Sequence, residues 1–228
     1  MTKHIAYLCA DPGIPVYGNK GASIHVQNII RALLRAGHRV TLFANRIDGA
    51  TPPGLEGVHL VPLPAPPKGD QENRARALLA ARDDVVATIA AHAPYDLIYE
   101  RYSLWSDSGV QYAENAHIPA VLEVNAPLID EQRTHRELVL PAEAEAIAAS
   151  NFARARELIA VSPGVAAYLK NWLPAFVQGS NRAYLTVGIG CTGGQHRSVY
   201  VTEQIAALLK PDFPGLHVEH RDRKSHSS

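Results

Sequence analysis

Short apolar runs alternate along the chain with longer segments in which apolar residues recur every three or four positions. The runs predict strands at 5–9, 39–44, 58–62, 95–100, 120–124, 157–161 and 184–189. The segments between them predict helices at 23–36, 71–92, 103–116, 130–155 with a break at Pro141, from 163, and 195–209. We therefore expect an α/β fold with a doubly wound, mainly parallel, Rossmann-like sheet in three layers, extended by a C-terminal strand-loop-helix-strand unit.

The loop after the first strand contains Gly18, Lys20 and Gly21. It should lie at the carboxyl edge of the sheet, where open α/β sheets bind ligands. Ser23 is expected to cap the following helix and Gly37 to end it. The glycines of this loop lack the G-x-G-x-x-G spacing of a dinucleotide fingerprint, so we expect no bound cofactor.

Polar residues also occur where two later strands end, and these ends should meet the same edge of the sheet. Glu100 and Arg101 end one strand, and Glu123 and Asn125 end the next. Solvated strand ends are often polar, so a structural role is an alternative for Glu100 and Arg101. His25, on the first helix, is expected to be a packed or capping residue rather than a catalyst.

Five short segments in the first three quarters of the chain can be compared with the motifs of known protein families. They are Gly18-Asn19-Lys20-Gly21-Ala22-Ser23-Ile24-His25-Val26, Gly37-His38-Arg39-Val40-Thr41-Leu42, Asp96-Leu97-Ile98-Tyr99-Glu100-Arg101, Leu122-Glu123-Val124-Asn125-Ala126-Pro127-Leu128 and Ala160-Val161-Ser162. In this order they resemble the N-terminal half of GT-B-fold retaining glycosyltransferases.

The resemblance implies that residues 1–172 form an acceptor-binding domain whose Gly18 to Ser23 loop faces the interdomain cleft. Glu100, Arg101, Glu123 and Asn125 would lie near that cleft, and a sugar nucleotide would be the donor. Members of this group hold the donor mainly in a second domain, through two Glu residues eight apart near a basic residue. That pattern does not follow here, since the sequence changes character at 171–181.

Residues 184–200 read Tyr-Leu-Thr-Val-Gly-Ile-Gly-Cys-Thr-Gly-Gly-Gln-His-Arg-Ser-Val-Tyr, a strand, a glycine-rich loop and the start of a helix. Backbone N–H groups at such a junction favour an anion, most often a phosphate. The expected phosphate-binding residues are Thr192, Gly193, Gly194, His196, Arg197 and Ser198.

Cys191 allows two interpretations of this loop. Cys191 and Arg197 have the spacing of cysteine-dependent phosphatases, in which a thiolate attacks the phosphate. The alternative is a small residue in a tight turn. A phosphatase also needs a general acid, and Asp212 lies beyond the far end of the loop's own helix, about 22 Å away at helical rise. We expect phosphate binding without Cys191-dependent turnover.

The same loop, together with the later His220-Arg221-Asp222, resembles the C-terminal domain of the RNase adapter protein RapZ, a family once catalogued as nucleotide-binding. This resemblance covers about the last quarter of the chain. It implies a phosphate or phosphosugar pocket lined by Thr192, Gly193, His196 and Arg197, in a domain that binds small RNA. Residues 173–228 are thus expected to form a RapZ-like segment that continues the same sheet, joined through a loop at 174–179.

We interpret the sequence as a hybrid, formed by natural fusion, a misjoined reading frame or engineering. One hypothesis is a glycosyltransferase acceptor domain without its donor domain, weak or inactive in sugar transfer. The other is a RapZ-like adapter module that binds a phosphosugar, a nucleotide or RNA. Whether the chain is an enzyme is left open between these two.

Charge and composition limit the remaining function classes. Residues 1–169 hold 15 Lys and Arg against 18 Asp and Glu, whereas residues 170–228 hold 7 against 4. The basic C-terminal part permits a phosphate or RNA partner. The chain has no apolar run long enough to span a membrane and starts without a signal-peptide pattern, so we expect a cytoplasmic protein. The two cysteines and the scattered histidines predict no metal site.

Overall fold

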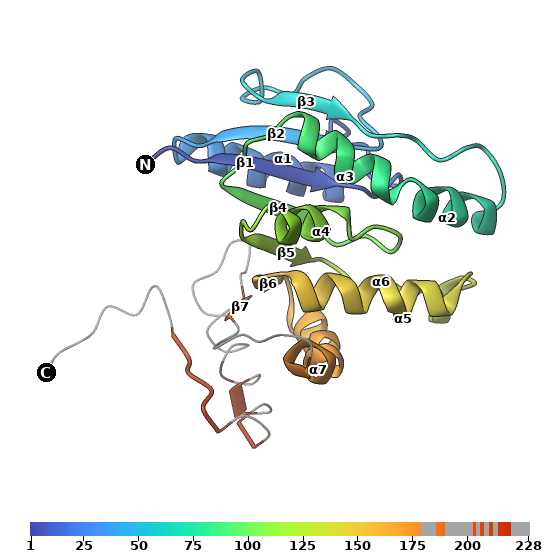
Figure 1. Cartoon of the computed structure of the whole chain (residues 1–228), viewed down its shortest axis with the longest axis vertical. Coiled ribbons are helices and arrows are strands. Elements are labelled where there is room, and N and C mark those ends of the chain that lie inside the picture. The colour runs from blue at the N-terminus through green and yellow to red at the C-terminus, as the bar shows by residue number, and fades with distance from the viewer. Residues whose placement is uncertain (179–185, 190–202, 204–205, 208–209, 212–213, 220–228) are drawn as a thin grey trace, which may run out of the picture.

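The computed structural model describes residues 1–178, 186–189, 203, 206–207, 210–211 and 214–219. Seven strands form one sheet in the order β3-β2-β1-β4-β5-β6-β7, and every neighbouring pair is parallel (Figure 1). The strands are β1 His4–Cys9, β2 Arg39–Ala44, β3 His59–Pro62, β4 Leu97–Arg101, β5 Ala120–Val124, β6 Glu157–Ala160 and β7 Thr186–Ile189. The predicted doubly wound, Rossmann-like α/β fold is confirmed.

Helices cover both faces of this sheet. They are α1 Gly21–Arg35, α2 Gln71–Ala80, α3 Arg82–Ala91, α4 Ser108–Asn115, α5 Leu128–His135, α6 Pro141–Arg154 and α7 Pro163–Gln178. Helix α1 lies behind the sheet in Figure 1, where Val26 and Ile30 are fully buried. Helices α3, α4, α6 and α7 contribute to the core on the opposite face. The structure therefore has three layers.

The alternation of side chains in β1 explains why its sequence is apolar at every position. Ile5 and Tyr7 belong to the core beneath α1, whereas Ala6 and Leu8 belong to the core beneath α3 and α4. A strand buried on both faces needs an apolar residue at each position. This requirement is the reason that the central strands could be predicted as continuous apolar runs.

Strand β7 extends the same sheet beside β6. The pairing is parallel, with Glu157 opposite Thr186 and Ala160 opposite Ile189. The prediction that the strand before the glycine-rich loop joins the sheet of the preceding domain is confirmed. Because the strands are parallel, β7 also ends at the same edge as β1, β4 and β5. The loop that follows lies outside the described residues.

The start of α1 differs from the prediction. The helix begins at Gly21 after Lys20, so Ser23 lies in its first turn and is not the cap. Lys20 has an extended backbone conformation, and its side chain makes no capping hydrogen bond. Ser23 is instead fully buried, because this part of the helix packs against the preceding loop. Gly37 ends the helical turn as predicted, with a left-handed φ of 84°.

Two boundaries in the second half also differ. Helix α4 begins at Ser108 instead of residue 103, since Ser103 and Ser106 pair in a short antiparallel bridge. The prediction of a loop at 174–179 is wrong for residues 174–178, because α7 continues to Gln178. At the start of α7, the Ser162 hydroxyl accepts a hydrogen bond from the Val165 N–H at 3.3 Å, so Ser162 caps this helix.

Candidate functional site

The sheet order changes direction between β1 and β4, and ligands of open α/β sheets bind at such a switch point, beyond the carboxyl ends of the strands. Arg101 is the last residue of β4, and Glu123 is the fourth residue of β5. The two residues are opposite each other in the parallel register. The sheet thus brings together two of the charged residues that the sequence predicted for a cleft.

Glu123 is the centre of a hydrogen-bonded cluster, and only 1% of its surface is exposed. Its Oε1 lies 2.9 Å from Nε2 of His25, accepts from Nδ2 of Asn125 at 2.8 Å and is 3.4 Å from Nη1 of Arg101. Its Oε2 accepts from the Tyr99 hydroxyl at 2.5 Å. Four side chains from α1, β4 and the end of β5 therefore converge on one carboxylate.

These donors keep Glu123 charged. Burial alone would raise the pKa of Glu123, but the hydrogen bonds from His25, Tyr99 and Asn125 outweigh burial and lower it. Burial raises the pKa of the Tyr99 hydroxyl, and the nearby charge of Glu123 raises it further. Because a carboxylate only accepts hydrogen bonds, Nε2 of His25 must carry the proton in this contact.

His25 is a member of the cluster that solvent reaches. Its side chain is 29% exposed, and its Nδ1 has no hydrogen-bond partner among the described residues. With the proton fixed on Nε2, Nδ1 of the neutral imidazole is an acceptor. The arrangement of a buried carboxylate behind a half-buried imidazole is suited to accept a proton from a bound hydroxyl group.

Arg101 brings a buried positive charge to the cluster. It is 9% exposed, and its Nε has no partner among the described residues. Beneath it, the ring of Tyr7 stacks on the ring of Tyr99, with the centroids 5.1 Å apart. Cys9 lies in the same core, and burial raises the pKa of its thiol to about 12. This cysteine is therefore an inert core residue.

The loop before α1 makes hydrogen bonds and close contacts with the helix that follows it. Gln27 donates from Nε2 to the carbonyl oxygens of Val16 and Gly18, at 3.0 and 2.8 Å. A Cβ at Gly18 would lie 2.9 Å from Pro15, so this glycine is required by close packing. At Gly21 a Cβ would meet no atom within 4 Å. The predicted loop is therefore built around Gly18, with Lys20 exposed at the helix start.

Glu100 lies apart from the cluster, although it is the neighbour of Arg101 in sequence. Its side chain is fully buried beneath α4, where Oε2 accepts from the N–H of Val110 at 2.9 Å. Successive residues of a strand point to opposite faces, so Glu100 faces α4 while Arg101 faces α1. The structure thus brings Arg101, Glu123 and Asn125 together and places Glu100 on the other side of the sheet.

His25 and Tyr99 complete the cluster and were not predicted as site residues. Tyr99 precedes Arg101 by two positions, so strand alternation places both on the same face. That signal was readable in the sequence. No comparable signal identified His25, because its contact with Glu123 depends on how α1 packs across β5.

The remaining predicted residues, Thr192, Gly193, Gly194, His196, Arg197 and Ser198, lie outside the described residues. Among the described residues, no three His, Cys, Asp or Glu side chains are grouped so that they could hold a metal ion. Within the same part of the chain, every helix is too short or too polar to cross a lipid bilayer.

Two family models match the chain. The model described as glycosyl transferase 4-like domain matches residues 20–178, and the model described as RapZ C-terminal domain matches residues 141–224. The two matches overlap across α6, β6 and α7. Both resemblances noted in the sequence are therefore confirmed.

Curated relatives match the chain over a short segment. A nucleotide-binding protein of Dichelobacter nodosus (strain VCS1703A) is 60% identical over 55 residues, which are 24% of this chain and 20% of that protein. A nucleotide-binding protein of Stutzerimonas stutzeri (strain A1501) is 57% identical over 56 residues, which are 25% of this chain and 19% of that protein. The chain thus spans about a fifth of the length of these relatives.

Solved structures resemble the fold of the whole described domain. Sucrose-phosphate synthase from Thermosynechococcus elongatus matches with a TM-score of 0.55 and 18% identity, covering 85% of this chain and 49% of that one. The UGT71G1 protein of Medicago truncatula, solved with UDP-glucose, matches with a TM-score of 0.50 and 12% identity, covering 83% and 51%. At these identities the likeness establishes the fold, which is that of one half of these proteins.

Proposed function

The chain belongs to the glycosyl transferase 4-like domain family, and we propose that residues 1–172 are the acceptor-binding half of a retaining glycosyltransferase of the GT-B fold. The observation that carries this proposal is the contact between His25 and Glu123 at the switch point of the sheet. It supplies a half-exposed proton acceptor at the edge where ligands of such sheets bind.

The chemistry of the pair follows from its geometry. A hydroxyl group of the acceptor donates to Nδ1 of His25. Its oxygen bonds to the anomeric carbon of the donor sugar on the face from which the nucleoside diphosphate leaves as an anion, so the configuration is retained, and its proton passes to the imidazole. Glu123 holds the ring through Nε2 and stabilises the positive charge that the imidazole gains. Because the carboxylate is already fixed by Tyr99 and Asn125, little reorganisation is needed during that step.

We further propose that the chain alone transfers sugar weakly or not at all. Retaining transfer needs an activated sugar nucleotide that is held rigidly against the acceptor. We propose that a RapZ-like segment follows the acceptor domain from 173, and we place the junction between the two patterns at 171–181. The match to the RapZ C-terminal domain model itself begins at 141. The hybrid character proposed here is supported by two different family models that match overlapping parts of the chain, 20–178 and 141–224.

The acceptor site predicts that His25→Ala weakens binding of a simple sugar by about threefold to tenfold, the cost of one hydrogen bond. Binding of glucose to the full chain is measured by saturation-transfer NMR in the wild type and the variant. His59→Ala is the matched control, because His59 is exposed at the opposite edge of the sheet. Unchanged glucose binding in His25→Ala, or rapid transfer from UDP-glucose or GDP-mannose by the chain alone, would contradict the proposal.

A second function is favoured by the relatives of the C-terminal segment. The match to the RapZ C-terminal domain, together with 60% identity to a protein named as nucleotide-binding, supports a phosphosugar, nucleotide or RNA site in residues 173–228. The residues we assign to it are Thr192, Gly193, Gly194, His196, Arg197 and Ser198. Their backbone N–H groups and the guanidinium of Arg197 are the donors that a phosphate needs.

This second function predicts that Arg197→Ala lowers the affinity for glucosamine 6-phosphate by about tenfold to a hundredfold, since a charged hydrogen bond to phosphate is lost. Calorimetric titration of the full chain measures the affinity, and Cys191→Ser is the control, with little change expected. Equal affinity in wild type and Arg197→Ala would refute the phosphate site.

A gel-shift titration with a small RNA tests the RNA alternative. Turnover of p-nitrophenyl phosphate that depends on Cys191 would instead identify a phosphatase.

A further inference from the structure

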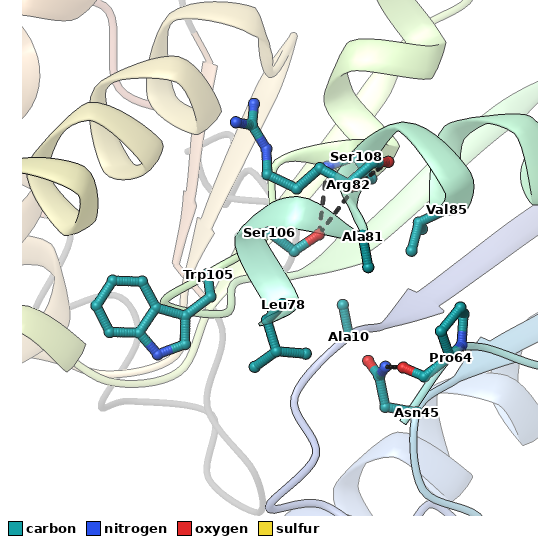
Figure 2. Close-up of a pocket in the computed structure, with 10 residues that line it drawn as sticks. All are labelled: Ala10, Asn45, Pro64, Leu78, Ala81, Arg82, Val85, Trp105, Ser106 and Ser108. Carbon is teal, nitrogen blue, oxygen red and sulfur yellow. Dashed lines mark hydrogen bonds between the residues drawn. The ribbon is translucent and has the colours of Figure 1, made fainter. Parts of the chain in front are cut away.

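The small pocket at the carboxyl edge of the sheet is too narrow for a sugar or a nucleotide. It lies between the ends of β1 and β2 and the helices α2 and α3, and it has room for about one water molecule (Figure 2). In it, Nδ2 of Asn45 donates to the carbonyl of Pro64 at 2.5 Å, and the Ser108 hydroxyl donates to the carbonyl of Arg82 at 3.1 Å. Imidazole nitrogens that could ligate a metal ion lie instead at the opposite, amino edge of the sheet.

The fold gathers histidines at this amino edge. His4 and His59 begin β1 and β3, His38 precedes β2, and His92 follows α3, ahead of β4. Because all neighbouring strands are parallel, they start at the same edge. Histidines that are scattered along the sequence are thereby brought to one side of the domain.

Two of these histidines are already engaged by the protein. Nδ1 of His4 lies 2.8 Å from the carbonyl oxygen of Pro94 and must donate, and its Nε2 accepts from the Thr41 hydroxyl at 2.9 Å. Nδ1 of His38 accepts from the N–H of Lys3 at 3.3 Å, so its Nε2 carries the proton. A metal ion would have to break these hydrogen bonds, so neither imidazole is suited to ligate one.

His59 and His92 form a pair with free nitrogens. Their ring centroids are 5.6 Å apart. Nδ1 of His92 donates to the carbonyl of Thr88 at 2.9 Å, which leaves a lone pair on Nε2. Histidines that ligate metal ions usually donate their other ring N–H to a carbonyl in this way. Within the described part of the chain, neither Nε2 of His92 nor the His59 ring has a hydrogen-bond partner.

The pair is fixed by the sheet and remains open to solvent. His59 is opposite Thr41 in the register and points to the same face as Val61, which belongs to the core beneath α3. The ring of His92 packs edge-on against the fully buried ring of Phe43, with the centroids 5.9 Å apart. His59 is exposed and His92 is half-buried, so water can reach both imidazoles.

We propose that His59 and His92 together bind a divalent transition metal ion such as Zn²⁺, which clasps the edge strand β3 to the end of α3. With a zinc–nitrogen bond of about 2.05 Å, the metal lies about 3.2 Å from each ring centroid, and the observed centroid separation corresponds to an angle of about 120° at the metal. This angle is close to tetrahedral, and water supplies the remaining ligands. The site lies at the opposite edge from the His25 cluster and is independent of the proposed acceptor site.

Zinc titration of the untagged full chain, followed by NMR of the imidazole nitrogens, tests the pair. We expect Zn²⁺ to shift Nε2 of His92 and one nitrogen of His59 together, and to raise the melting temperature. His59→Ala and His92→Ala should each lower the affinity at least about tenfold, the loss that removal of an outer-shell partner alone causes. His135→Ala, at an exposed position in the last turn of α5, is the matched control and should leave zinc binding unchanged.

The residue-specific signals decide the outcome. Zinc in excess that shifts only one of the two rings, or neither, would overturn the proposal, as would a shift of His92 that persists in His59→Ala. An equal rise of the melting temperature in the wild type and in His59→Ala would show that zinc binds elsewhere. If His92→Ala fails to fold, His59→Gln decides in its place, because the exposed Gln carries no imidazole and should abolish the shift of His92.

Discussion

Replacing Asp107 with Asn is expected to lower the free energy of unfolding by about 3 kcal/mol, because removing one charge of a buried ionic cluster leaves the others uncompensated. Asp107 is completely buried. Its Oδ1 is 2.6 Å from Arg82 of α3, and its Oδ2 is 3.4 Å from Arg154 of α6 and accepts from the Ser150 hydroxyl. One carboxylate thus connects α3, α4 and α6.

The exposure of Arg82 and Arg154 determines how much free energy of unfolding Asp107→Asn loses. Their side chains are 31% and 33% exposed, so solvent already screens part of their charge. We therefore expect a loss at the lower end of the range for buried pairs. Arg154 also contacts Glu114 at 2.7 Å, which keeps it partly compensated when Asp107 is neutral. Asn retains the volume of Asp, so the change removes charge without creating a cavity.

Urea denaturation at pH 7, followed by circular dichroism, measures the loss. Asp83→Asn is the control, because Asp83 is exposed in the first turn of α3, and its replacement should cost less than about 1 kcal/mol. Equal stability of Asp107→Asn and Asp83→Asn would mean that the ionic cluster contributes little beyond packing. In that case the docking of α3 and α6 on α4 would rest on their apolar residues alone.

The sheet could be predicted from the sequence because each central strand is buried on both faces. In a run such as Ile5 to Cys9 every side chain is buried, so each position must be apolar. Polar loops on either side mark the ends of the run. The apolar run at 184–189 also predicted a strand, and the structure describes β7 over Thr186–Ile189. Helix boundaries were less predictable, since Lys20 begins α1 by backbone geometry without a side-chain cap, and α7 continues through Pro174.

The candidate site could be predicted only in part. Arg101, Glu123 and Asn125 were found because polar residues at strand ends must meet at one edge of a parallel sheet. Glu100 occupies the same stretch of sequence, yet strand alternation sends it to the other face. The contact between His25 and Glu123 could not be predicted, because it joins residues 98 positions apart in sequence and depends on the packing of α1.

Glu100 provides the second large effect, a pH dependence of stability. Burial raises the pKa of Glu100 to about 8, and the N–H groups of Val110 and Gly109 counteract this only partly. Its Oε2 accepts from Val110 at 2.9 Å, but its Oε1 has no partner. Gly109 allows this approach, since a Cβ there would lie 2.6 Å from the carboxylate.

The sign of the pH effect follows from proton binding. Between the unfolded pKa of 4.5 and the folded value of about 8, the folded chain holds a proton on Glu100 that the unfolded chain has released. Stability therefore falls as the pH rises through this interval and levels off above it, by up to about 5 kcal/mol for this one group. Below pH 4.5 both states are protonated and the contribution vanishes.

Glu100→Gln should remove this dependence, because Gln keeps an oxygen for the Val110 N–H and carries no charge. We expect the variant to be as stable as the wild type near pH 4.5 and more stable by about 3–5 kcal/mol at pH 9. Urea denaturation at a series of pH values measures the difference, with Glu131→Gln, at an exposed position of α5, as the control. A wild type that stays equally stable from pH 5 to pH 9, or a variant that is less stable at every pH, would show that the N–H groups at the start of α4 hold Glu100 as an anion. Glu100 would then fix the position of α4 by its charge.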